Sequence, residues 1–478
     1  MRLFLIGWCG SLPEVADVAF MLKNRSYEIK YWVVSDDSAI DKSKFSETVF
    51  HNSFDAADNL PAAGFNGVEF EFPDKNFVKR FSEAESVVMT MMNKHFELMG
   101  IEERKHLYYG MLKYWCGVIR HLKPEAIIFS SIPHAPYEYV IYSIARELNI
   151  KTILFEPFWL NDRMLVLNDY KIGSEYVARE IGRNRGKQFT PADISNDLRE
   201  YYQMQMNKAM DSTPGYMKDF QKARSGKNWL RLKIMALVNV VRSGIFFEKA
   251  ANFLFKKFRH NLKKEYIRAQ SSPDLKRKYV YFPLHYQPEC ATSPLGDIFV
   301  DQLLAAEILS ASLPVGWFLY VKEHPTQWWI RGAGYFSYRY KGYYEKMSKL
   351  KNTKIVSMQA DTYSLIDNAA AVATITGTAG WEAILRQKPA LIFGYPWYKH
   401  APGILEIDNV KSCSEALQKI ANGFIPSKQE IINYFVALDR GSFRGYFKYR
   451  KQILNKISQK ENTANLLNVL LKELENIG

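Results

Sequence analysis

The sequence predicts an α/β protein built from two Rossmann-like halves. In two parts of the chain, the first 160 residues and the stretch from Tyr279 onward, short apolar runs typical of buried strands alternate with helix-like segments. Residues 176–275, between these parts, lose the alternation and become long and charged. A chain of 478 residues that is 47% hydrophobic and 24% charged can form two or three packed domains.

The first half opens with a βαβ unit. Its apolar strand at 3–6 is followed by a turn at 7–11, a helix at 14–23 and a second strand at 29–35. A later unit places strands at 126–130 and 152–155 around a helix at 137–148. Gly7 and Gly10 are fewer glycines than a full dinucleotide-binding fingerprint contains, so this turn alone identifies no ligand.

In the second half the alternation is nearly continuous. The predicted strands are 279–284, 317–322, 354–357, 371–376 and 390–394, and the helices between them are 299–311, 341–349, 362–368 and 381–387. Loops at the carboxyl ends of parallel strands converge, so 285–297, 323–330, 358–361, 376–380 and 395–403 should meet at one crevice. The predicted organisation is therefore a domain at 1–175, an insertion or bridge at 176–275, a second domain at 276–425, and a helical tail at 426–478 that packs back on the first.

The N-terminal and cysteine patterns predict a cytoplasmic protein. The apolar run near Met1 is too short for a spanning helix and lacks a small-residue cleavage site. The four cysteines are scattered and form no C-x-x-C motif, which argues against a disulfide framework and against a cysteine zinc site. We expect core thiols.

Basic residues gather in one segment. Residues 221–268 hold 13 lysines and arginines against 2 acids, in a chain of net charge +14. Five of them would lie within about 60° of one helical face; they are Arg231, Arg242, Lys249, Lys256 and Lys263. The segment is either an amphipathic helix suited to an anionic membrane surface or the solvated face of a packed helix. No nucleic-acid-binding motif is present, so we expect no such partner.

The turn after strand 371–376 is a candidate phosphate site. Thr376-Gly377-Thr378-Ala379-Gly380 carries no bulky side chain and precedes a helix, so its amide N–H groups can approach an anion. The alternative is a plain β-turn-α connection that needs glycine only for backbone geometry. Glu382, one turn into the helix, can accept hydrogen bonds from ribose hydroxyls or can complement the helix N-terminus.

Two further strand ends carry polar residues that point to the same crevice. His324, in the loop Glu323-His324-Pro325, can hydrogen-bond a phosphate oxygen or, when protonated, neutralise it; otherwise it is an ordinary loop histidine. The predicted donor-binding set is His285, Gln287, Lys322, Glu323, His324, Thr376, Gly377, Thr378, Gly380 and Glu382. No Asp-x-Asp triplet occurs, so we expect no metal and no cofactor, with His324, helix dipoles and Lys322 stabilising a leaving phosphate.

The stretches "YFPLHYQPECATSPLG", "VKEHP" and "TGTAGWEAILRQKPALIFGYPWY" resemble the C-terminal half of bacterial capsule polysaccharide biosynthesis proteins, the group that includes β-Kdo transferases using CMP-activated sugars. The resemblance covers roughly 279–403; "IPHAPYEY" fits more loosely, and 176–275 is not covered. It implies a GT-B fold in which His324, Thr376, Gly377, Thr378 and Glu382 hold the nucleotide. The same turn is similar to that of UDP-GlcNAc 2-epimerases, so it indicates a nucleotide sugar more firmly than CMP.

The function implied by this resemblance is an inverting, metal-independent glycosyltransferase of cell-surface polysaccharide synthesis. It would move a Kdo-like or nonulosonic acid from its CMP form to a saccharide or glycolipid acceptor, at the inner face of the membrane if the basic segment binds lipid. The alternatives are a UDP-sugar-using GT-B enzyme, a nucleotide-sugar 2-epimerase, and a non-catalytic carbohydrate-binding protein of capsule assembly.

A carboxylate of the first half should deprotonate the acceptor hydroxyl. Glu138, one turn into the helix after "IPHAP", is the first candidate, with His134 beside it and Glu156 as the runner-up. The alternative role of Glu138 is to complement the helix dipole, and Glu156 could instead cap a loop.

Overall fold

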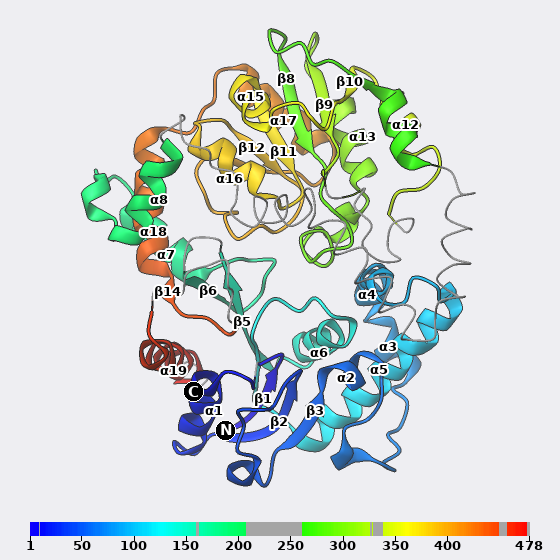
Figure 1. Ribbon diagram of the computed structural model, residues 1–478, viewed down its shortest axis with the longest axis vertical. Helices are drawn as coiled ribbons and strands as arrows, with labels where there is room; N and C mark the ends of the chain where they lie inside the picture. Colours follow the sequence, from blue (N-terminus) through cyan, green and yellow to red (C-terminus); the bar gives the residue numbers. More distant parts are fainter. Residues whose placement is uncertain are drawn as a thin grey trace, which may run out of the picture.

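The computed structural model describes residues 1–8, 10–158, 162–206, 261–325, 327, 338–448 and 457–475. The strands of these residues form two sheets of seven strands, one in each half of the molecule (Figure 1). The N-terminal sheet has the order β14-β6-β5-β4-β1-β2-β3, and the C-terminal sheet has the order β13-β12-β11-β8-β9-β10-β7.

The N-terminal sheet is parallel except at one edge. Its strands are β1 (Arg2–Ile6), β2 (Glu28–Val34), β3 (Val49–Asn52), β4 (Ala126–Phe129), β5 (Lys151–Pro157), β6 (Arg163–Leu167) and β14 (Phe443–Arg444). The stretch β3-β2-β1-β4-β5 is parallel and has the strand order of a Rossmann half, whereas β6 and β14 are antiparallel additions.

The C-terminal sheet is parallel throughout. Its strands are β7 (Gln270–Ser271), β8 (Tyr279–Pro283), β9 (Phe318–Lys322), β10 (Thr353–Val356), β11 (Ala371–Thr374), β12 (Ala390–Ile392) and β13 (Ile404–Glu406). Counted from β8, its main strands follow the doubly wound order 3-2-1-4-5-6. The predicted α/β architecture of two Rossmann-like halves, as in GT-B proteins, is therefore confirmed.

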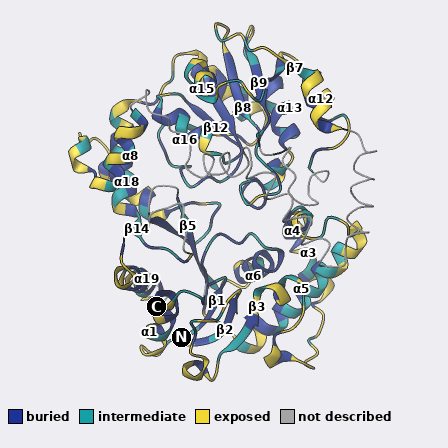
Figure 2. Cartoon of the chain, in the orientation of Figure 1, coloured by how far each residue is buried: buried dark blue, intermediate teal, exposed yellow. Residues whose placement is uncertain are grey.

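Helices cover the faces of both sheets, and the strands between them are buried (Figure 2). The N-terminal half contains α1 (Pro13–Lys23), α2 (Ser53–Ala57), α3 (Lys75–Lys79), α4 (Ser82–Met91), α5 (Ile101–Leu122), α6 (Pro136–Glu147), α7 (Glu175–Asn184) and α8 (Asn196–Met206). The C-terminal half contains α12 (Leu262–Ala269), α13 (Gln302–Ser312), α14 (Tyr343–Ser348), α15 (Thr362–Asn368), α16 (Thr378–Leu385) and α17 (Val410–Ala421). Burial on both faces explains why the strands read as continuous apolar runs.

The end of the chain returns to the first half. Helix α18 (Lys428–Gly441) packs against α7, β14 pairs with β6, and α19 (Gln459–Glu475) packs against α1. Leu466, Leu470 and Leu474 of α19 are buried in the core cluster that also contains β1 side chains.

Helix α16 begins three residues earlier than the sequence predicted, at Thr378 instead of 381. Gly380, which we counted as a turn residue, lies inside the helix. A Cβ at Gly380 would lie 2.5 Å from the Tyr398 hydroxyl oxygen. Glycine is therefore needed here because the Tyr398 side chain comes so close, and not because the backbone forms a turn. The turn before α16 is correspondingly shorter and ends at the N-cap residue, Gly377.

Most of the basic segment lies outside the described residues. Of its five regularly spaced basic residues, only Lys263, on α12, is described. None of the helices in the described ranges is both long enough and apolar enough to cross a bilayer.

Candidate functional site

In each sheet the strand order reverses direction at one point. This point lies between β1 and β4 in the N-terminal sheet and between β8 and β11 in the C-terminal sheet. In open α/β sheets, ligands bind outside the carboxyl ends of the strands at this point. Predicted site residues follow these strands: His285 comes after β8, Thr376 and Gly377 come after β11, and Glu138 comes after β4.

His285 holds the turn after β11 in place. Its Nε2 accepts a hydrogen bond from the backbone N–H of Thr376 at 3.3 Å and lies 3.1 Å from Thr374 Oγ1. Because a backbone N–H can only donate, Nε2 carries no proton. Burial lowers the pKa of His285 to about 3, so the ring stays neutral at physiological pH.

Gly377 is required by this contact. Its φ is −71°, which any residue adopts, but an added Cβ would lie 2.9 Å from His285 Cε1 and 2.9 Å from Thr374 Oγ1. Its N–H donates to Thr374 Oγ1 at 3.0 Å. The N–H groups of Thr376 and Gly377 are therefore taken up by protein partners, and a ligand would meet the first turn of α16.

Glu382 lies near that first turn. Burial raises the pKa of its carboxyl to about 7, while the charge of Arg386 and a hydrogen bond from the Thr378 hydroxyl oppose the shift. Near neutral pH the group can therefore accept a hydrogen bond as a carboxylate or donate one as an acid. This suits a contact with sugar hydroxyls.

Lys322 ends β9 and is tied to the loop before α15. Its Nζ donates to the carbonyl oxygen of Ala360 at 2.6 Å and to Thr362 Oγ1 at 2.8 Å. Burial lowers the pKa of Lys322 to about 8, against the opposing charge of Asp361. The ammonium group remains mostly charged at neutral pH, in a fixed position at the end of the strand.

Glu323 and Gln287, both predicted to contact the donor, are instead bound to protein groups. Glu323 is fully buried, pairs with Arg339 at 2.8 Å, and accepts the N–H of His324 at 2.7 Å. Gln287 Oε1 accepts from Arg339 Nη1 at 2.6 Å and from Gln302 Nε2 at 2.8 Å. These two residues support the loops of the site from beneath.

His324 lies beside Tyr286, with ring centroids 6.2 Å apart. Burial lowers its pKa, and the charges of Arg339 and Lys322 add to this effect against that of Glu323. The ring is therefore neutral at physiological pH. Of the two roles considered from the sequence, this favours hydrogen bonding over charge neutralisation.

Glu138 caps the helix on which it lies. Its Oε2 accepts the backbone N–H groups of His134 at 2.9 Å and Ala135 at 3.1 Å, so that Glu138 caps the start of α6. Its Oε1 accepts from the Tyr137 hydroxyl at 3.3 Å. His134 Nδ1 lies 3.0 Å from the Ile132 carbonyl oxygen.

Glu156, on β5, stands at the boundary between the halves. Burial raises the pKa of its carboxyl to about 8. Burial also raises the pKa of the Cys290 thiol, and the negative charges of Glu156 and Glu138 contribute to that shift. Cys290 belongs to the loop after β8, so the charges of two N-terminal carboxylates reach this loop of the C-terminal half.

Direct contacts join the halves around this boundary. Thr90 Oγ1 lies 2.7 Å from Ser293 Oγ, and Lys171 forms an ion pair with Asp297 at 3.5 Å. The rings of Phe158 and Trp397 stack with centroids 5.2 Å apart. The two halves therefore meet along an interface that includes part of the loop after β8.

Comparison with protein families supports the interpretation of the C-terminal half. Residues 298–416, about a quarter of the chain, match the family described as "Capsule polysaccharide biosynthesis protein". The resemblance stated from the sequence is confirmed. This capsule-family segment includes Lys322, His324, the turn before α16 and Glu382, and excludes His285 and the N-terminal carboxylates.

Solved structures that this chain matches include KpsC of Thermosulfurimonas dismutans, a β-Kdo 2,7 transferase. The two chains are 12% identical with a TM-score of 0.33 over 80% of this chain and 96% of that one. UDP-GlcNAc 2-epimerase of Methanocaldococcus jannaschii is 13% identical with a TM-score of 0.24, over 99% of this chain and 100% of that one. No curated protein matches the chain. The site is therefore assigned from the residues of this chain.

Sequence reasoning missed Arg339, which lies in the capsule-family segment and is fully buried. It occurs in the run "YFSYRYKGYY", where nothing distinguishes it from a surface arginine. Gln302, buried at the start of α13, was missed for the same reason.

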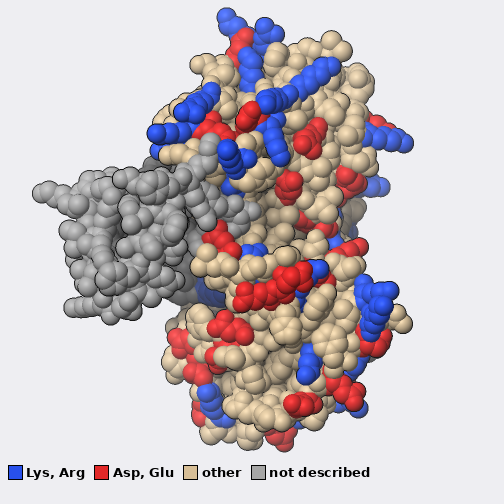
Figure 3. Space-filling model, turned by 90° about the vertical axis from the view of Figure 1, so that its right-hand side faces the viewer, with Lys and Arg blue, Asp and Glu red and all other residues tan. Residues whose placement is uncertain are grey.

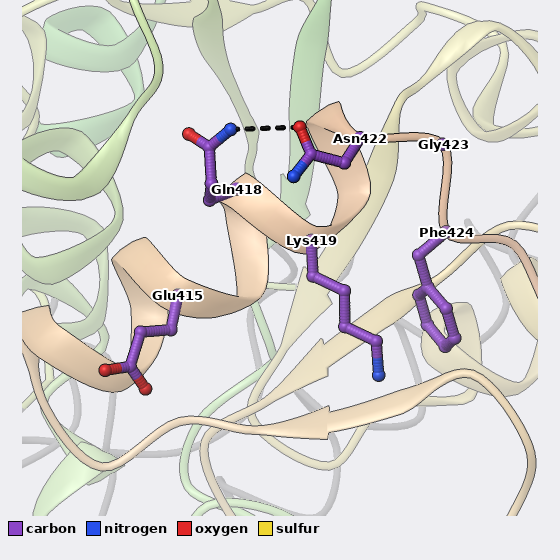
Figure 4. A pocket seen from close by; sticks show the side chains of 6 residues that line it. All are labelled: Glu415, Gln418, Lys419, Asn422, Gly423 and Phe424. Carbon is purple, nitrogen blue, oxygen red and sulfur yellow. Dashed lines mark hydrogen bonds between the residues drawn. The ribbon is translucent and has the colours of Figure 1, made fainter.

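A surface hollow lies at the end of the capsule-family segment and just beyond it. It is lined by side chains from the C-terminal part of α17 and the residues after it, among them Gln418, Lys419 and Phe424 (Figure 4). None of the predicted site residues lines it. Within the described part of the chain, no group of three or more histidine, cysteine or acidic residues is arranged to hold a metal ion.

Proposed function

We propose that this chain is a glycosyltransferase of cell-surface polysaccharide synthesis, of capsule or lipopolysaccharide, that uses a nucleotide-activated sugar as donor. The observation that carries the proposal is the pairing of two strand-end sites across one interface. The loop after β8 contains both His285, which holds the turn before α16, and Cys290, whose pKa is raised in part by the charge of Glu156 on the opposite sheet. Donor and acceptor of a transfer reaction need such facing sites.

The proposed donor is a CMP-linked Kdo-like or nonulosonic acid. A CMP-sugar carries a single phosphate, which needs less positive charge than a diphosphate. Lys322 and the N-terminus of α16 supply positive charge suited to one phosphate. We therefore propose that transfer needs neither metal nor cofactor. Glu382 would contact the ribose, and His324 would hydrogen-bond the phosphate as a neutral ring.

In the proposed mechanism, Glu156 is the general base. Its carboxylate takes the proton of the acceptor hydroxyl, the hydroxyl oxygen forms the new bond to the anomeric carbon, and CMP departs with the electrons of the broken bond, with inversion. A pKa near 8 makes Glu156 an effective base near neutral pH. Glu138, the first candidate from the sequence, becomes the second because its Oε2 is already used by two backbone N–H groups.

The test is incubation of the full chain with CMP-Kdo, CMP-nonulosonates and UDP-GlcNAc, each with and without a glycolipid acceptor and with EDTA. We expect acceptor-dependent release of CMP that survives EDTA. Conversion of UDP-GlcNAc without acceptor would identify an epimerase. Saccharide binding without turnover would identify a carbohydrate-binding assembly protein.

The anomeric configuration of the product, measured by NMR, tests the mechanism separately. Inversion agrees with Glu156 as base. Retention would overturn the direct displacement and leave a carboxylate at this interface as a nucleophile instead.

A further inference from the structure

We propose that Arg339 is a positioning residue that fixes the loop after β8 and the loop after β9 relative to each other, and thereby places His285 and His324. The effect on catalysis rests on the function proposed above. The effect on the loops does not, so the two can be tested separately.

Arg339 touches both loops at once. On the β9 side, its Nε and Nη2 bind the two carboxylate oxygens of Glu323 at 2.8 and 3.2 Å. On the β8 side, its Nη1 binds Gln287 Oε1 at 2.6 Å and its Nη2 binds the His285 carbonyl oxygen at 3.1 Å. One planar guanidinium thus carries four hydrogen bonds to two loops, a pattern that a lysine ammonium cannot reproduce.

The contacts continue from Arg339 to the site itself. Glu323 accepts the backbone N–H of His324, so the carboxylate that Arg339 holds also fixes the start of the His-Pro loop. The His285 backbone is held from the other side by Gln302, whose Oε1 accepts the His285 N–H at 2.7 Å. The ring of His285 then holds the N–H of Thr376 in the turn before α16. A shift of the His285 backbone would therefore move the donor turn.

The burial of this pair argues for positioning and against a purely stabilising role. Arg339 and Glu323 are both fully buried. The free-energy cost of removing two charged groups from water offsets most of the stabilisation that their attraction provides. Buried ion pairs can therefore often be replaced by apolar residues without loss of stability. The position of this pair between two loops of the site is better explained by the geometry that it imposes on those loops.

Arg163 provides a matched control. It is also buried, forms ion pairs with Asp197 and Asp439 at 2.8 Å, and joins elements of the N-terminal half and the tail. Arg163→Lys removes a buried guanidinium fork of the same kind, away from the donor loops. Loss of packing should affect both variants alike.

The experiment compares Arg339→Lys and Arg163→Lys with wild type in the full chain. Amide hydrogen exchange of 284–287 and 323–324 is measured first, without any ligand. Calorimetric titration with CMP and steady-state kinetics follow. We expect faster exchange of both loops and at least tenfold weaker CMP binding in Arg339→Lys only, since small misplacements of binding groups can cost about 10²-fold.

The outcomes separate this inference from the proposed function. Unchanged exchange of both loops in a folded Arg339→Lys variant would overturn the inference, as would equal loosening in both variants. If Arg339→Lys does not fold, Gln302→Leu, which removes the other support of His285, gives the same test on the β8 loop. Faster exchange in Arg339→Lys, with no nucleotide binding even in wild type, would support the positioning role and refute the proposed function.

Discussion

Glu156 and Glu138 lie near the same thiol but have different surroundings, and this difference can be tested. A general base works in its deprotonated form, and the pKa of Glu156 is raised to about 8. We therefore expect kcat/KM to fall as pH drops below about 8 and to reach a plateau above it. Glu156→Gln should lower turnover by about 10²–10⁴-fold and remove this pH limb, as measured from pH 6 to 9.5 with saturating donor.

Glu138→Gln is the control for that prediction. Because its Oε2 accepts two backbone N–H groups of α6, its loss should cost about 1 kcal/mol of stability and leave turnover within a few-fold. The reverse result would make Glu138 the base.

A measurement of stability adds a second check on Glu156. Between about pH 4.5 and 8 the folded protein keeps the proton on this carboxyl, whereas the unfolded chain releases it. The contribution of Glu156 to the free energy of unfolding therefore falls as pH rises through this range. Glu156→Gln should then be the more stable protein at pH 9.

Gly377 is predicted to tolerate no side chain. In Gly377→Ala the new methyl group would lie 2.9 Å from His285 Cε1, so the ring or the turn must move. We expect CMP affinity, measured by calorimetry, to fall about tenfold or more, as for other displaced binding groups. Gly182→Ala in α7 meets no atom within 4 Å and should leave affinity unchanged, with stability unchanged or slightly higher. Equal affinity in both variants would contradict the assignment of the turn.

The sequence could locate the loops of the site but could not assign every side chain in them. Residues after parallel strands must converge, and this rule alone groups His285, His324 and Thr376 at one crevice. The partner of Glu323 lies 16 residues away and that of Gln287 lies 52 residues away, both at Arg339. Pairings over such separations depend on tertiary structure, so side chains predicted to face a ligand proved to face the protein.

At the level of elements, buried strands were predictable and the start of α16 was not. Strands covered on both faces are continuous apolar runs, and β1, β4, β8 and β11 all lie within a residue or two of their predicted positions. Gly380 reads as a turn residue in the sequence. The space that it leaves for the Tyr398 hydroxyl is a tertiary contact, and only the structure reveals it.

Arg163 joins elements that are distant in the sequence, and its removal should destabilise the protein. It lies on β6 and binds Asp197 at the start of α8 and Asp439 on α18. Arg163→Met would leave two carboxylates without their buried partner, at a cost of about 3–5 kcal/mol. Urea unfolding measures this. Arg183→Met removes an exposed pair with Glu180 and should cost under about 1 kcal/mol; similar losses in both would show that burial does not matter at Arg163.

At the scale of the whole molecule, the two-domain plan follows from the alternation of strands and helices. The last strand at the edge of the N-terminal sheet, β14, does not follow from it. Strand β14 is only two residues long and pairs antiparallel with β6, 276 or more residues before it. Two residues carry no periodicity. The return of the tail to the first half was predicted, but its pairing with β6 becomes visible only in three dimensions.

The charge of the molecule leads to the last prediction. On the face shown in Figure 3, lysine and arginine side chains gather mainly on the C-terminal half. The densest basic stretch of the sequence, 221–268, precedes that half in the chain. We predict that this stretch binds anionic lipid and brings the site to a membrane-anchored acceptor. Each lysine or arginine near such a surface contributes about 1 kcal/mol, so changing Arg242, Lys249 and Lys256 to Glu should release the protein from anionic vesicles in a flotation assay.

A matched variant distinguishes local binding from net charge. Lys341, Lys346 and Lys351 are exposed on the C-terminal half, and changing them to Glu alters the total charge by the same amount. This variant should remain bound to the vesicles. Both variants should keep their activity on a soluble acceptor, because neither set of residues belongs to the site. Failure of the wild-type chain to bind anionic vesicles at low salt, where surface electrostatics is strongest, would show that the stretch is a solvated basic face.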